Sequence, residues 1–295
     1  MITNKKSFKI FVNVILSLLA LFSVLPIFLV FMASITEEQT LILNGYSFVP
    51  QVFSLYAYKY ILFSGNVILR AYLITISVTA IGTFVNLFLT TFLAYPLSKK
   101  DLKGRNIILF MVFFTMLFNG GLVSSYMMWT QIFHIRDTYF ALLVPNLMMN
   151  AFNVIIMKNF FVNNIPESLL EAAKLDGATE LQILNKVVFP LSKPIIATVG
   201  MMVGLAYWND WQNGLYFLLM KTNLYGIQNV LNTMINNVQF LSTQAASQGG
   251  AAAGSLPSTG IRMAIAVIAL APVIIIYPFV QKAFVKGIVV GGVKG

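Results

Sequence analysis

The sequence predicts an all-α integral membrane protein with six transmembrane helices. Hydrophobic residues make up 58% of the 295 residues, charged residues make up 9%, and the mean hydropathy is +0.83. Soluble domains carry about 25% charged residues, so lipid rather than water must solvate most of the outer surface. Because about 20 apolar residues span a bilayer core as a helix, a chain of this length holds roughly six spans and their loops.

Six apolar stretches follow one another along the chain, and each is long enough for a helical span if occasional polar residues face the bundle interior. Continuous apolar runs such as Ile107–Phe114 lack the alternation of β-barrel strands, so helices are predicted. The first stretch is expected to be retained, because it is too long for a signal peptide and no small-residue cleavage pattern follows it. The predicted spans are residues 10–34, 71–97, 106–129, 139–161, 194–220 and 261–284.

The positions of the basic residues predict how these spans are oriented. The chain has 19 Lys and Arg against 9 Asp and Glu. With a cytoplasmic N-terminus, only five basic residues fall on the outer side, namely Lys59, Arg70, Arg136, Lys221 and Arg262. Cytoplasmic loops of membrane proteins are enriched in Lys and Arg, so both termini are predicted to be cytoplasmic. Because the basic residues flank apolar segments, the positive charge does not require a nucleic-acid partner.

The predicted loops divide the chain into three parts. Residues 1–69 contain the first helix and an external loop, residues 70–290 the transmembrane core, and residues 291–295 a cytoplasmic tail. The first external loop carries five aromatic residues suited to a membrane interface or a partner: Tyr46, Phe48, Tyr56, Tyr58 and Tyr60. The last external loop contains a flexible linker sequence at 248–255. No internal repeat is evident, which argues against an inverted-repeat secondary transporter.

Residues 162–193 form a long loop that is predicted to lie in the cytoplasm and to begin with a short helix. Pro166 suits the first turn of a helix, where its missing N–H has no cost, and Glu167 suits the positive end of the helix dipole. Glu171 and Lys174 are three residues apart, a spacing that allows a weak supporting ion pair.

A tight turn and a second helix are predicted to follow. Gly177 can adopt a positive φ and end the first helix. A second helix is expected from Glu180 to Val188, until Pro190 and Pro194 stop it. Such a projection could transmit force between a membrane bundle and a soluble partner. An amphipathic helix that lies on the lipid surface is the alternative.

A motif across these two helices resembles that of permease subunits of bacterial ATP-binding-cassette importers. The family signature is Glu-Ala-Ala, three residues, Gly, nine residues and an ending similar to Ile-x-Leu-Pro. Here Glu171-Ala172-Ala173 and Gly177 have this spacing, and Val187-Val188-Phe189-Pro190 supplies the ending. The resemblance extends over residues 70–290 and implies the type I importer permease fold with a cytoplasmic coupling helix.

The resemblance implies that the Glu-Ala-Ala segment couples the membrane bundle to an ATPase. The implied coupling residues are Glu171, Ala172, Ala173, Asp176, Gly177 and Pro190. The implied partners are a second, different permease subunit, two ATPase subunits and an extracytoplasmic substrate-binding protein, assembled in the bacterial cytoplasmic membrane among its lipids. ATP and Mg would bind to the ATPase subunits, because this chain has no Gly-x-x-x-x-Gly-Lys-Ser/Thr phosphate loop. No cofactor is expected on the chain itself.

The resemblance also implies the class of substrate. Residues 281–295 resemble the tails of carbohydrate permeases, and 118–121 and 151–157 are similar to the branch that handles complex oligosaccharides, including uronate-containing and host-glycan fragments. The expected function is therefore that of a permease subunit in an ATP-driven, binding-protein-dependent importer of oligosaccharides. An ion-coupled secondary transporter is the alternative.

Polar residues inside the predicted spans are candidates for a substrate pathway. A carboxylate at membrane depth costs about 2.5–3.5 kcal/mol, so Asp210 should face a cavity or a partner. Its aromatic and amide neighbours suit sugar rings, although a position near the outer interface would also explain the tryptophans. The pathway candidates are Trp208, Asn209, Asp210, Trp211, Asn119 and Asn153, and Gly200 and Gly204 are expected to allow close helix packing.

An enzymatic function is not predicted. The single histidine, His134, lies in a short loop without evident metal partners. Ser124 and Ser125 lack the Gly-x-Ser-x-Gly pattern that would expose a nucleophile.

Overall fold

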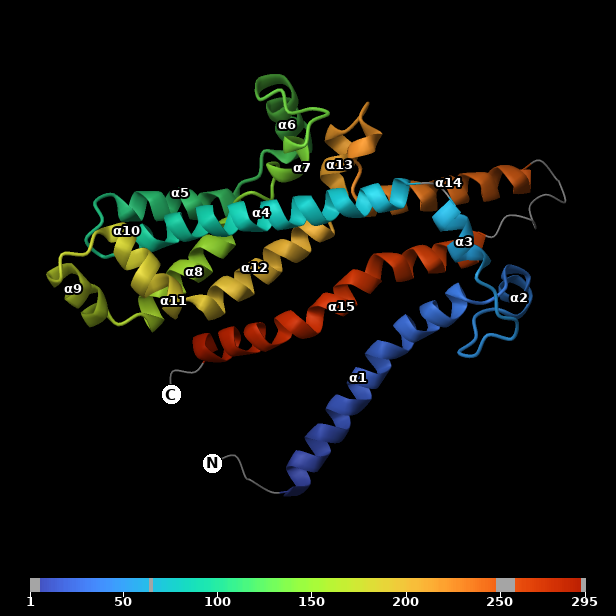
Figure 1. Cartoon of the computed structure of the whole chain (residues 1–295), viewed down its shortest axis with the longest axis horizontal. Helices are drawn as coiled ribbons and strands as arrows, with labels where there is room; N and C mark the ends of the chain where they lie inside the picture. The colour runs from blue at the N-terminus through green and yellow to red at the C-terminus, as the bar shows by residue number, and fades with distance from the viewer. Residues whose placement is uncertain (1–5, 64–65, 248–257, 293–295) are drawn as a thin grey trace. The chain divides into compact units, whose positions relative to one another are not determined.

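The computed structural model describes residues 6–63, 66–247 and 258–292, and within these ranges the chain is mostly helical (Figure 1). In order the helices are α1 (Lys6–Ser34), α2 (Glu38–Asn44), α3 (Tyr56–Phe63), α4 (Val67–Ser98), α5 (Arg105–Leu117), α6 (Gly121–Met127), α7 (Phe140–Leu143), α8 (Ala151–Asn164), α9 (Glu167–Leu175), α10 (Glu180–Ile183), α11 (Phe189–Leu191), α12 (Lys193–Trp208), α13 (Gln212–Phe217), α14 (Ile227–Ser247) and α15 (Ser258–Gly292). Two π-helical turns, η1 (Met128–Ile132) and η2 (Leu184–Val188), and one 3-10 turn, η3 (Thr222–Leu224), complete the helical elements. The predicted all-α fold class is confirmed.

Two predicted features fall outside the described residues. These are the linker at 248–255 and the last three residues of the tail predicted at 291–295.

Residues 1–68 and 231–273 form one compact unit. Within this unit, the carboxylate of Glu38 on α2 accepts hydrogen bonds from the backbone N–H groups of Thr259 (2.8 Å) and Gly260 (2.6 Å). These N–H groups belong to the first turn of α15 and have no partner inside that helix. A negative charge is favoured there by the helix dipole, so Glu38 fixes the start of α15.

Residues 69–230 and 274–295 form the second unit, whose core lies among α4, α8 and α12. The helices α4 and α12 approach each other closely because glycines lie at their contact. A Cβ atom added at Gly82 would lie 2.4 Å from the ring of Tyr207, and one added at Gly200 would lie 3.2 Å from Leu87. At Gly204 the nearest atom would be the Thr83 hydroxyl, at 3.5 Å.

The membrane spans are less regular than predicted. Among the described residues, α1 and α4 are the two continuous helices that are long and apolar enough to cross a membrane. Two further pairs could each form a broken span: residues 105–117 with 121–132, bent by 116°, and residues 180–191 with 193–208, bent by 82°. The helical residues Thr259–Ile275 form a shorter apolar stretch. The number of six spans therefore stays a prediction.

Three spans predicted as continuous helices are interrupted, and that part of the prediction was wrong. The span at 106–129 breaks after α5, where Gly121 adopts a φ of 82°. The span at 139–161 breaks over residues 144–150, which include Pro145 and Asn146, the latter with a φ of 63°. The span at 194–220 breaks after Trp208. Hydropathy identifies the apolar stretches, but it contains no information on the residues that interrupt a helix, such as Gly121 and Asn146 with their positive φ.

The break at 144–150 leaves backbone carbonyls without helical partners, and side chains from three other elements pair with them. The Tyr207 hydroxyl donates to the carbonyl of Leu143 (2.8 Å). The side-chain amide of Asn213 donates to Pro145 (3.0 Å), and that of Asn86 donates to Leu147 (2.8 Å). Irregular backbone at membrane depth is tolerated only when such groups are satisfied within the protein. We call these three donors and their acceptors the carbonyl clamp.

Replacing Asn86 by Leu tests the carbonyl clamp. Asn86 is fully buried, and it also accepts a hydrogen bond from Thr90. The variant Asn86→Leu should lower the free energy of unfolding by about 1–3 kcal/mol, the usual cost of unpaired buried polar groups. Thermal unfolding of the purified protein in detergent measures this effect. The exposed Asn106→Leu change on α5 is the control, and equal melting temperatures for the two variants would contradict the role of the clamp.

Candidate functional site

Residues 166–191 fold into two short helical segments, which we call the hairpin. The first is α9, and the second runs through α10, η2 and α11. Pro166 has a φ of −61° and a ψ of 131°, so it lies immediately before α9 rather than inside its first turn. Glu167 is the first residue of α9, so its charge lies at the positive end of the helix dipole, as predicted.

The turn of the hairpin depends on a left-handed glycine. Gly177 has a φ of 78°, and its N–H donates to the carbonyl of Lys174 (3.0 Å). The N–H of Ala178 donates to the carbonyl of Ala173 (3.0 Å), which closes the turn. An added Cβ at Gly177 would have no neighbouring atom within 4 Å. The glycine is therefore required by the backbone conformation and not by lack of space.

The second helical segment begins with a capping box and extends further than predicted. The Thr179 hydroxyl accepts from the N–H of Gln182, whose side chain in turn accepts from the N–H of Thr179. The predicted stop at Pro190 was wrong, because the helical segment continues to Leu191. The wide π-helical turn η2 precedes this proline, and the chain bends at Ser192, between α11 and α12.

The predicted coupling residues do not all have the same exposure. Ala173 is half-buried and packs against the core of the second unit, whereas Glu171, Ala172, Asp176, Gly177 and Pro190 are exposed. Leu175, at the end of α9, is 89% exposed. Its side chain is therefore almost entirely free of contacts with the rest of the described chain.

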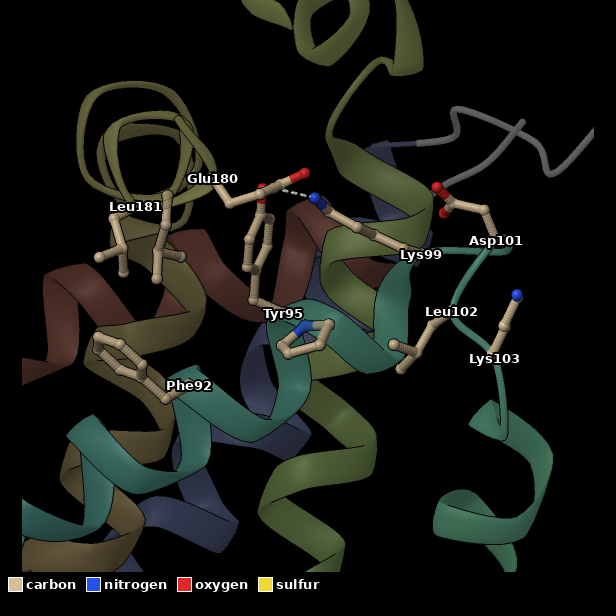
Figure 2. Close-up of a pocket in the computed structure, with 10 residues that line it drawn as sticks. Phe92, Tyr95, Lys99, Asp101, Leu102, Lys103, Glu180 and Leu181 are labelled. Atoms are coloured by element: carbon tan, nitrogen blue, oxygen red, sulfur yellow. Dashed lines mark hydrogen bonds and ion pairs between the residues drawn. The ribbon is translucent and has the colours of Figure 1, made fainter. Parts of the chain in front are cut away.

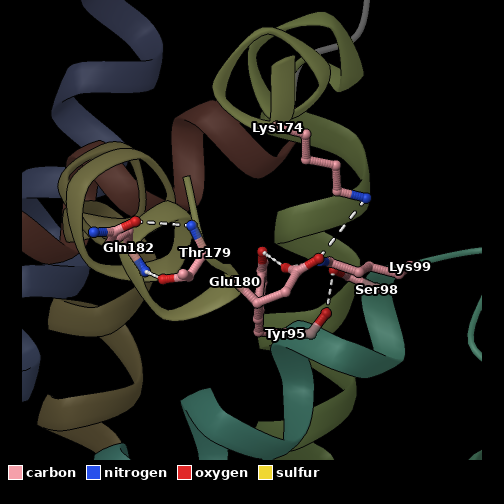
Figure 3. Close-up of polar contacts among 7 residues, drawn as sticks. All are labelled: Tyr95, Ser98, Lys99, Lys174, Thr179, Glu180 and Gln182. Atoms are coloured by element: carbon pink, nitrogen blue, oxygen red, sulfur yellow. Dashed lines mark hydrogen bonds and ion pairs between the residues drawn. The ribbon is translucent and has the colours of Figure 1, made fainter. Parts of the chain in front are cut away.

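Glu180, the first residue of α10, attaches the hairpin to the end of α4 (Figure 3). Its carboxylate accepts hydrogen bonds from the Tyr95 hydroxyl (2.8 Å) and from the ammonium of Lys99. Lys174 lies 3.8 Å from the same carboxylate, so it pairs with Glu180 and not with Glu171 as predicted. This attachment could not be predicted from the sequence, because Tyr95 and Lys99 lie more than 80 residues before Glu180.

The charge of Glu180 is stabilised by these partners. The Lys99 hydrogen bond holds the pKa of Glu180 below its ordinary value, and the Tyr95 hydroxyl acts in the same direction. A carboxylate with a lowered pKa stabilises the folded state above its ordinary pKa, and it loses this contribution as the pH falls through the lowered value. The carboxylate of Glu180 is therefore ionised near neutral pH.

A hollow of about 590 Å³ lies beside this attachment, between the end of α4, the following loop and α10 (Figure 2). Phe92, Leu181 and Leu184 contribute apolar lining. The charged lining consists of Lys99, Lys103, Asp101 and Glu180. Two basic and two acidic side chains balance each other, so the hollow does not select a charged ligand.

Four of the predicted pathway residues lie around the third interruption, after Trp208, and one of them bonds to backbone N–H groups. Trp208 is buried at the end of α12, where its ring is 6.3 Å from that of Tyr72. Asp210 lies in the break and accepts hydrogen bonds from the N–H groups of Gln212 (3.1 Å) and Asn213 (3.2 Å). Asn209 and Trp211 are exposed. The carboxylate of Asp210 therefore pairs with the first two N–H groups of α13, a role that was not predicted from the sequence.

The remaining candidates lie on other elements. The exposed Asn119 accepts from the N–H of Gly121 (2.9 Å) at the bend between α5 and α6. Asn153 is buried within α8. Gly200 and Gly204 face α4, near Leu87 and Thr83.

Comparisons with known proteins agree on one family. The family profile described as "Binding-protein-dependent transport system inner membrane component" matches residues 103–290. The polygalacturonan/rhamnogalacturonan transport system permease protein YtcP of Bacillus subtilis is 39% identical over 280 residues, which cover 95% of this chain and 96% of that protein. The arabinooligosaccharides transport system permease protein AraQ of the same species is 28% identical and covers 98% and 96%.

A solved structure has the same fold. It belongs to a crystal structure described as a bacterial ABC transporter involved in the import of the acidic polysaccharide alginate, with a TM-score of 0.80 and 30% identity. The match covers 96% of this chain and 100% of that chain. These findings favour an importer subunit over the ion-coupled alternative.

The capping box of the hairpin can be tested with two substitutions at one position. Thr179→Ala removes the side-chain acceptor and should destabilise the start of α10 by about 1 kcal/mol. Amide hydrogen exchange over residues 180–188 should then become faster. Thr179→Ser keeps the hydroxyl and should exchange like the unchanged protein. Equal exchange in the Ala and Ser variants would contradict the role of the cap.

Proposed function

The chain belongs to the family of binding-protein-dependent transport system inner membrane components, and we propose that it couples oligosaccharide import to ATP hydrolysis through the hairpin. It is a permease subunit of a carbohydrate importer and not itself an enzyme. The observation that carries the proposal is the exposed tip of the hairpin, where a left-handed glycine and an 89% exposed leucine project from an anchored base.

The proposed coupling surface is formed by the exposed side of α9 and the turn that follows it. Its exposed residues are Glu171, Ala172, Asp176 and Gly177, with Pro190 on the returning segment, and the half-buried Ala173 lies at its edge. Small side chains at 172 and 173 allow a partner to approach the helix backbone closely. An ATPase subunit is the proposed occupant, and ATP and Mg are bound there and not on this chain.

The proposed assembly contains a second, different permease subunit, two ATPase subunits and an extracytoplasmic binding protein in the bacterial cytoplasmic membrane. Both termini and the hairpin lie on the cytoplasmic side. The distribution of Lys and Arg supports this orientation. The names of the similar proteins support oligosaccharides, including uronate-containing ones, as the substrate class.

A substrate pathway is proposed beside the interrupted helices. Asn209, Trp211 and Asn119 present exposed side chains there, and amides and indoles suit the hydroxyls and apolar faces of sugars. Trp208, Asp210 and Asn153 are proposed to support the wall of this pathway without contacting the sugar. Trp208 and Asn153 are buried, and Asp210 is bonded to backbone.

The turn of the hairpin provides the first test of coupling. Gly177→Val forces a branched residue into the left-handed region, which costs on the order of 1–2 kcal/mol. Import of oligosaccharide by the complete transporter should be abolished, while the amount of protein in the membrane is unchanged. Gly104→Val is the matched control, because Gly104 has a φ of 79° and equally open surroundings. Normal import by Gly177→Val would refute the proposal.

Cross-linking provides a direct test of the partner. The chain has no cysteine, so a single Leu175→Cys variant carries one defined attachment point. A short bifunctional reagent should link residue 175 to the ATPase subunit. Met220→Cys is the control, since Met220 is also an exposed apolar residue of the second unit, at 82%. If residue 220 but not residue 175 is linked to the ATPase, the hairpin does not lie on the cytoplasmic side of the membrane, and the proposal is refuted.

A further inference from the structure

Two consecutive lysines at the end of α4 hold the two segments of the hairpin. Lys99 pairs with Glu180, the first residue of α10, and Lys100 pairs with Glu167, the first residue of α9 (3.3 Å). In both cases a glutamate lies at the positive end of a short helix, where a negative charge is already favoured. The end of α4 is thus bonded to the beginning of both helices.

The two attachments differ in strength. The Glu167 and Lys100 side chains are 69% and 76% exposed, and such surface pairs contribute little. The Glu180 side chain is 55% exposed, but that of Lys99 is only 17% exposed, and the Lys99 ammonium lies 4.5 Å from the centre of the Tyr95 ring. The buried Tyr95 adds its own hydrogen bond to Glu180. Glu180 therefore carries most of the attachment, and Glu167 offers a natural control.

The helix that receives this attachment also contacts α12 and the break before α8. Further along α4, Gly82 lies against the ring of Tyr207 on α12. Asn86 of α4 donates to Leu147 in the break before α8. A displacement of the end of α4 would therefore reach α12 and the carbonyl clamp through packed and hydrogen-bonded groups.

We propose that Glu180 is a positioning residue that joins the hairpin to α4, so that movement of the hairpin drives α4 together with α12. The chain already links the hairpin to α12 through the bend at Ser192. The Glu180 junction adds a second, noncovalent link, through Lys99 and Tyr95. With two links, the hairpin transmits a rotation to a pair of helices instead of pulling on one. This inference rests on the proposed coupling function.

The test compares Glu180→Gln with Glu167→Gln in the complete transporter, reconstituted in proteoliposomes with its binding protein and with radiolabelled galacturonate oligosaccharides as the probe. The readout is the amount of oligosaccharide imported per ATP hydrolysed, which a loss of folded protein does not change. Glu180→Gln should lower this ratio by about fivefold. Glu167→Gln should leave the ratio within about twofold, because its pair is exposed. Equal ratios in both variants and the unchanged transporter would overturn the inference.

A charge exchange and a milder variant complete the test. In a Lys174→Gln background, which removes the neighbouring ammonium from the single and double variants alike, Lys99→Glu combined with Glu180→Lys restores an ion pair, and the Tyr95 hydroxyl can accept as well as donate. The double variant should recover part of the ratio lost in each single variant, and no recovery would count against the junction. If Glu180→Gln does not assemble, Tyr95→Phe removes one hydrogen bond and should lower the ratio by a smaller factor, whereas an unchanged ratio would refute the role.

The proposed function and this inference fail in different ways. If the Leu175→Cys variant is not linked to the ATPase, the coupling surface itself is misplaced. If residue 175 is linked but Glu180→Gln keeps the full ratio, the hairpin couples without the junction, and only the inference is wrong.

Discussion

The second unit depends on the pairing of three backbone carbonyls at the break between α7 and α8. An unpaired carbonyl in hydrocarbon costs several kcal/mol, and no water is present there to compensate it. The carbonyl clamp satisfies alternate carbonyls with a tyrosine and two asparagines from three different elements. Each donor therefore has to lie in one position along its own helix, and the packing of α4, α12 and α13 follows from that requirement.

The close contact of α4 with α12 is a consequence of the same constraint. The Tyr207 hydroxyl reaches the carbonyl of Leu143 only because its ring passes over Gly82, where a Cβ would overlap it. Small residues at helix contacts are common in membranes, where close backbone approach replaces the hydrophobic drive of water. Here the small residue also makes room for the side chain that satisfies the break.

The sequence predicted the features that depend on local chemistry. The short helix at α9, the turn at Gly177 and the following helix could all be expected, because capping, glycine and dipole effects act over a few residues. The continuation past Pro190 was missed, since a proline predicts a stop unless a wide turn precedes it. The partners of Glu180 and Asp210 were also missed. Two of them lie more than 80 residues away, and the others depend on where a predicted span breaks.

The two helical segments of the hairpin divide two proposed tasks, docking on a partner and transmitting force to the membrane helices. The proposed docking surface is exposed and includes small and apolar side chains, such as Ala172 and Leu175. A joint that transmits force has to be bonded on several sides, as at Glu180. Because Lys174 on α9 also pairs with Glu180, the exposed helix is tied to the joint by its own side chain. A load applied at the tip of α9 therefore reaches the membrane helices through side-chain bonds as well as through the backbone.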